Sequence, residues 1–93
     1  MYIVSYDIAL DKRRKKIANI LENYGKRIQY SIFECDLDEK RYQKLYQEIL
    51  KETSDMTDGS VRFYYLCANC VPKCKLIGQE KPSAYQSDKV IVI

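Results

Sequence analysis

A chain of 93 residues with a formal charge of +3 forms one small domain with a marginal core, which dimerisation would supplement. The absence of histidine excludes a Ser-His-Asp triad, a Cys-His pair and any acid–base mechanism that depends on imidazole. The sequence has no long apolar run and no signal-peptide pattern, so we expect a cytoplasmic protein whose four cysteines are reduced thiols.

The first segment, residues 2–8, is predicted to be a β-strand that ends in a carboxylate. Because side chains alternate between the two faces of a strand, Ile3, Ser5 and Asp7 share one face. Asp7 stands at the strand end, shortly before a run of five cations. This pattern indicates a site for a divalent metal and phosphate, and the alternative is that Asp7 only forms the turn.

A helix is predicted from Asp11, as its N-cap, to Gly25, as the glycine that ends it. Apolar residues at three-four spacing form its buried stripe: Ile17, Ile20, Leu21 and Tyr24. Its first turn carries five cations, which oppose the helix dipole: Lys12, Arg13, Arg14, Lys15 and Lys16. This run is equally consistent with phosphate contact and with a solubilising charge cluster.

Residues 26–37 are rich in β-branched and aromatic residues and are predicted to be strand. The segment is long for one strand, so we expect a break near residues 29–31. Asp38 is predicted to cap a second, structural helix, whose apolar stripe is Tyr42, Leu45, Tyr46, Ile49 and Leu50.

The remaining segments are predicted as a polar turn at 53–59, a strand at 61–67, a hairpin connection at 68–74, a strand at 75–77, an extended linker at 79–89 and a terminal strand at 90–93. Four apolar residues at a terminus would be hazardous as a free edge, so we expect the terminal strand to pair with a partner protomer. We therefore divide the chain into a core, 1–78, and a linker with its terminal strand, 79–93.

The hairpin connection carries Cys67, Cys70 and Cys74. Tetrahedral zinc needs four ligands, and without histidine Cys35 would have to join them or two chains would share the site. Simple thiols near a turn are therefore favoured over zinc.

With the middle segment divided, the element order is β-α-β-β-α-β, which predicts an α+β ferredoxin-like sandwich with an extra C-terminal strand. Both helices would cover one face of an antiparallel sheet. The other face, which includes Asp7, would be free for a homodimer with its sheets face to face.

Several segments together resemble the CRISPR-associated protein 2 family: Tyr6-Asp7-Ile8, the basic start at 12–14, Gly25, residues 27–35, residues 60–64, Leu66-Cys67 and Ile77-Gly78. The resemblance covers nearly the whole chain. It implies a ferredoxin-like homodimer of CRISPR spacer acquisition that lies between two copies of an integrase and holds duplex DNA. For several members it also implies a metal-dependent endonuclease that acts on single-stranded RNA or double-stranded DNA.

The resemblance implies that Asp7 is the metal ligand and catalytic residue. Together with Lys12 from the basic run, it gives these nucleic-acid-binding residues: Lys12, Arg13, Arg14, Arg27, Ser31 and Phe33. Mg²⁺ keeps several waters and often takes only one or two protein carboxylates. Two Asp7 residues that meet across a dimer axis would therefore suffice to hold one ion.

Two other functions remain open. A non-catalytic duplex-DNA scaffold that bridges integrase subunits would use residues 12–16, Arg27 and Arg62 as phosphate contacts. A small regulatory interaction domain would have no nucleic-acid affinity, since a fold alone does not determine function. A cysteine nucleophile has little support without a base such as histidine.

Overall fold

The computed structural model describes residues 1–78, so the expected linker and terminal strand, 79–93, lie outside the described residues. The elements are the strands β1 (Tyr2–Ile8), β2 (Lys26–Gln29), β3 (Ile32–Cys35) and β4 (Gly59–Tyr65), the helices α1 (Asp11–Glu22) and α2 (Glu39–Glu52), and a short 3-10 helix, η1 (Val71–Lys73). This order contains the predicted β-α-β-β-α-β arrangement.

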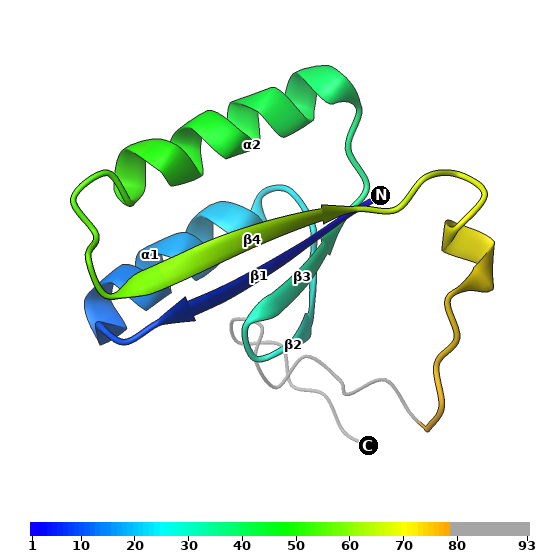
Figure 1. Ribbon diagram of the computed structural model, residues 1–93, viewed down its shortest axis with the longest axis horizontal. Helices are drawn as coiled ribbons and strands as arrows, with labels where there is room; N and C mark the ends of the chain where they lie inside the picture. The colour runs from blue at the N-terminus through cyan, green and yellow to red at the C-terminus, as the bar shows by residue number, and fades with distance from the viewer. Residues whose placement is uncertain (79–93) are drawn as a thin grey trace.

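The four strands form one antiparallel sheet in the order β2-β3-β1-β4, with β1 in the interior. Figure 1 shows α1 and α2 running alongside the strands. The chain after β4 leaves the sheet at the end where the N-terminus lies. The order and direction of the strands confirm the predicted ferredoxin-like fold.

The core lies between the sheet and the two helices. Alternate residues of β1 point into it, and Val4, Tyr6 and Ile8 are buried. The helices contribute buried residues at the predicted spacing, namely Ile17, Leu21, Leu45 and Ile49. The side chains of Ile3, Ser5 and Asp7 therefore lie on the other face of the sheet, which we call the open face.

Two details of the sequence prediction are confirmed. The middle segment breaks at a turn over Tyr30 and Ser31, and β2 and β3 lie on either side of it. Asp38 caps α2, because its carboxylate accepts a hydrogen bond of 2.8 Å from the backbone N–H of Arg41.

Two predictions are wrong. Leu10, not Asp11, is the N-cap of α1, and the Asp11 carboxylate instead binds the Arg14 guanidinium and lies 3.4 Å from Lys15 Nζ. Residues 75–77 form no strand, because no described strand lies beside them to accept their backbone hydrogen bonds. Ile77 is accordingly 97% exposed.

Candidate functional site

The open face carries the residue predicted to bind metal. Asp7 is exposed near the end of β1, where it lies directly opposite Ser60 of β4. Its carboxylate makes no hydrogen bond or ion pair within residues 1–78. The carboxylate oxygens are therefore available to a ligand from solvent.

Arg62 of β4 shares this face with Asp7. It pairs with Ser5, so Arg62 and Asp7 are diagonal neighbours whose Cα atoms are roughly 7–8 Å apart. Arg62 is exposed, and its Nη1 lies 3.5 Å from the Tyr64 hydroxyl. An exposed guanidinium is a side chain that binds phosphate well, through charge-assisted and often bidentate hydrogen bonds. The signal in the sequence is alternation: Arg62 stands between two apolar residues that pack against the core, so its own side chain faces away from the core.

The donor set limits which metal this face can hold. Within residues 1–78 no three His, Cys, Asp or Glu side chains converge on one point. A closed site with four protein ligands, of the kind that zinc prefers, therefore does not fit. A single exposed carboxylate does fit Mg²⁺, which retains most of its waters and takes few protein ligands.

Arg13 and Arg14, predicted to contact phosphate, both bind groups of this chain. Arg13 Nη1 lies 2.9 Å from Asp55 Oδ1 and 3.3 Å from the backbone oxygen of Glu52, so it joins α1 to the end of α2. Arg14 donates to the backbone oxygens of Ile8, at 2.9 Å, and Ala9, at 3.2 Å. Arg14 thus holds the turn that follows Asp7, whereas Arg13 holds α1 against the end of α2.

The ion pair between Arg13 and Asp55 alters both groups. A hydrogen bond from Arg13 lowers the pKa of the Asp55 carboxyl, and the same bond raises the pKa of the Arg13 guanidinium. The side chain of Arg13 is 17% exposed, whereas that of Asp55 is 79% exposed. Asp55 therefore neutralises much of the charge that Arg13 would offer to a phosphate.

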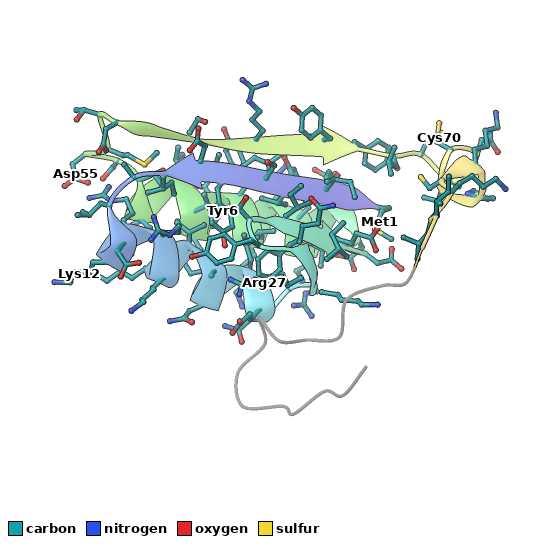
Figure 2. All side chains as sticks on the ribbon, turned by 90° about the horizontal axis from the view of Figure 1, so that it is seen from below. Met1, Tyr6, Lys12, Arg27, Asp55 and Cys70 are labelled. Carbon is teal, nitrogen blue, oxygen red and sulfur yellow. The ribbon has the colours of Figure 1, made fainter. Side chains whose placement is uncertain are left out.

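The lysines of the same turn are more accessible. Lys12, Lys15 and Lys16 are exposed, and the ion pairs of Lys15 with Asp11 and of Lys16 with Glu52 are long, at 3.4 and 3.8 Å. Lys12 and Asp55 lie at one end of the molecule, and Cys70 lies at the opposite end (Figure 2). The start of α1, with its exposed lysines, therefore lies at the end of the molecule away from Cys70.

The structure places Arg27, Ser31 and Phe33 near one another at the β2 side of the sheet. The Arg27 guanidinium is 5.1 Å from the centre of the Phe33 ring, and its Nη2 lies 3.3 Å from the Tyr6 hydroxyl. The backbone oxygen of Ser31 accepts a hydrogen bond of 3.1 Å from the N–H of Tyr6.

Phe33 itself does not fit its predicted role. It is fully buried, so its ring packs in the core and cannot stack on a base in this conformation. The structure therefore removes Phe33 from the accessible nucleic-acid contacts.

No described helix is both long enough and apolar enough to cross a membrane.

The family model of CRISPR associated protein Cas2 matches residues 1–74. The CRISPR-associated endoribonuclease Cas2 1 of Chloroflexus aurantiacus is 41% identical over 91 residues, which are 98% of each chain.

Two solved structures are similar to this chain. A hypothetical protein from Thermus thermophilus has a TM-score of 0.74 at 34% identity, covering 87% of this chain and 93% of its own. A chain of a partial Cas6-RT-Cas1–Cas2 complex has a TM-score of 0.70 at 30% identity, covering 99% and 97%. Sequence and structure agree over almost the full length, and the chain belongs to the CRISPR-associated protein Cas2 family.

Proposed function

We propose that this chain acts in CRISPR spacer acquisition as a homodimeric, Mg²⁺-dependent nuclease that binds nucleic acid and works with an integrase. The observation that carries the proposal is the exposed Asp7 carboxylate at the end of β1, which has no partner within residues 1–78. The endoribonuclease name of the Chloroflexus relative supports the activity, and the complex that contains Cas1 and Cas2 supports the integrase partner.

The chemistry follows from the side chains that are present. Imidazole is not present to act as a general base, and a bound Mg²⁺ would activate water and neutralise charge on the phosphate. Asp7 would supply oxygen ligands to that ion, and two copies of Asp7 would supply both carboxylates of one shared site. Arg62, on the same face, would hold the phosphate by charge-assisted hydrogen bonds.

The test is a cleavage assay at low salt, with labelled single-stranded RNA and duplex DNA and with Mg²⁺ or a chelator. We expect Asp7→Asn to bind normally and to cut at least about a hundredfold more slowly, because it removes a metal ligand. Asp36→Asn is the matched control, since it removes the same charge at an exposed position beyond β3. Cleavage by Asp7→Asn at the wild-type rate would remove Asp7 from the mechanism.

A second function is a non-catalytic duplex-DNA scaffold between integrase subunits. The observation that favours it is the exposed group of Lys12, Lys15 and Lys16, which can bind phosphates without any metal. In the same assay this function predicts salt-sensitive binding by all three proteins and cleavage by none. Absence of binding by the wild type would instead support a regulatory interaction domain.

A further inference from the structure

Three exposed cysteines lie in the segment that follows β4, at the end of the molecule away from Lys12 (Figure 2). The sulfurs of Cys67 and Cys70 are 3.4 Å apart. The backbone N–H of Cys70 donates a 2.9 Å hydrogen bond to the oxygen of Cys67, which closes a tight turn between them. Two thiols are thus held side by side at the surface.

We propose that Cys67 and Cys70 form a redox-active dithiol, in which Cys67 attacks a low-molecular-weight disulfide and Cys70 resolves the product. This function is independent of Asp7 and of nucleic-acid cleavage. The turn geometry permits it, because residues three apart in such a turn have Cα atoms less than about 7 Å apart, within the range that a disulfide spans.

The two sulfurs are in contact, but their surroundings differ. A hydrogen bond with the Cys70 thiol and the backbone N–H groups of Cys70 and Asn69 lower the pKa of Cys67. The hydrogen bond with Cys67, and then the charge of its thiolate, raise the pKa of Cys70. The thiolate is the nucleophile in disulfide exchange, so Cys67 attacks first.

The reaction balances in two exchanges. The Cys67 thiolate attacks one sulfur of a small disulfide, R–S–S–R, forming a Cys67–S–S–R bond and releasing one thiolate, RS⁻. Cys70 loses its proton and attacks the Cys67 sulfur, which releases the second RS⁻ and forms the Cys67–Cys70 disulfide. The protein loses two electrons and two protons, and the small disulfide becomes two thiols.

The other two cysteines provide internal comparisons. Cys74 Sγ lies 3.7 Å from the backbone oxygen of Cys70, and no third metal-ligating side chain converges with this pair within residues 1–78. Cys35 is fully buried, and burial, with a smaller effect from Glu34, raises the pKa of its thiol to about 11. Burial thus sets Cys35 apart, and the 3.4 Å contact of their sulfurs makes Cys67 and Cys70 the pair that we expect to exchange.

The test treats the reduced full-length protein with oxidised glutathione at pH 7, blocks free thiols with a maleimide and locates the disulfide by peptide mass spectrometry. We expect a Cys67–Cys70 disulfide in the wild type and in Cys74→Ser. Cys70→Ser should accumulate glutathione on Cys67, whereas Cys67→Ser should react at least tenfold more slowly. Iodoacetamide labelling of the wild type, resolved by residue, should modify Cys67 fastest and Cys35 slowest.

Three outcomes would overturn the proposal: equal labelling rates at Cys67, Cys70 and Cys74, an oxidised product that pairs Cys74, or stoichiometric zinc that protects these thiols in protein purified without chelator. Circular dichroism of each serine variant verifies that it is folded. The labelling experiment needs no variant, so the proposal stays testable even if a variant does not fold.

Discussion

The backbone of Gly25 lies so close to β3 that a side chain does not fit there. It follows α1, but its φ is not positive, so the turn itself does not require glycine. The requirement comes from β3: a Cβ atom on Gly25 would lie 2.2 Å from the backbone oxygen of Glu34 and 2.5 Å from Cys35 Sγ. The prediction that this glycine ends the helix is wrong, because α1 ends at Glu22 with Asn23 as its C-cap.

Replacing Gly25 with alanine should therefore lower the free energy of unfolding by about 1–3 kcal/mol, as overpacking of a core does. Urea denaturation measures the change. Asn19→Ala introduces the same residue at an exposed site on α1, where it should be neutral or slightly stabilising because alanine favours helix. A Gly25→Ala midpoint equal to that of the wild type would mean that β3 moves away at no cost.

Other residues show why only part of the site could be predicted. Alternation along β1 is sufficient to place Asp7 on the open face. The partner of Arg13 is Asp55, 42 positions away in the sequence, and no local pattern reports such a contact. The face of the sheet on which Phe33 lies depends on where the middle segment breaks into β2 and β3. A shift of one residue in the pairing moves every side chain of a strand to the other face.

At the scale of elements, α2 was the easiest to predict. An Asp38 cap precedes an apolar stripe of more than two turns, and the two signals agree. Residues 75–77 have strand-like composition, but a strand also needs a neighbour, which composition does not report. The start of α1 could be predicted in part. The sequence predicts the helix, but the hydrogen bonds of Arg13 and Arg14 to carboxylate and backbone groups depend on the tertiary structure.

Because Arg13 and Arg14 bind groups of this chain, we expect the exposed lysines of α1 to make the phosphate contacts. Lys12→Ala should weaken duplex-DNA binding and reduce the salt slope of log K by about 0.9, the value for one lost phosphate contact. Lys44→Ala removes the same charge from the exposed side of α2 and should leave the slope unchanged. Fluorescence anisotropy at several salt concentrations measures both, and identical slopes for the two variants would exclude a localised phosphate site at α1.

At the scale of the molecule, the two helices of residues 1–78 both lie on one face of the sheet. The open face presents apolar side chains among its polar ones: Ile3 and Ile32 are partly exposed, and Tyr64, which lies opposite Ile3, is 50% exposed. Such a face favours the proposed homodimer with its sheets face to face, which would also bring two copies of Asp7 toward each other.

Sedimentation equilibrium tests this arrangement. The wild type should be a dimer, and Tyr64→Lys should raise its dissociation constant at least tenfold, about 1.4 kcal/mol, because it places charge in the interface. Leu50→Lys is closely matched, since Leu50 is 49% exposed but lies on α2, and it should leave the dimer intact. A monomeric wild type, or equal effects of the two lysines, would exclude the open face as the interface.

The interior position of β1 has a consequence for the order of folding. β1 is synthesised before its two neighbours, and it pairs with β3 on one side and with β4, the last described strand, on the other. The pairing of Tyr2 with Tyr65 closes almost the whole described chain into one loop. The nascent chain can therefore dock β3 early, but the four-stranded sheet of residues 1–78 forms only after β4 has been synthesised, and such long-range contacts slow folding.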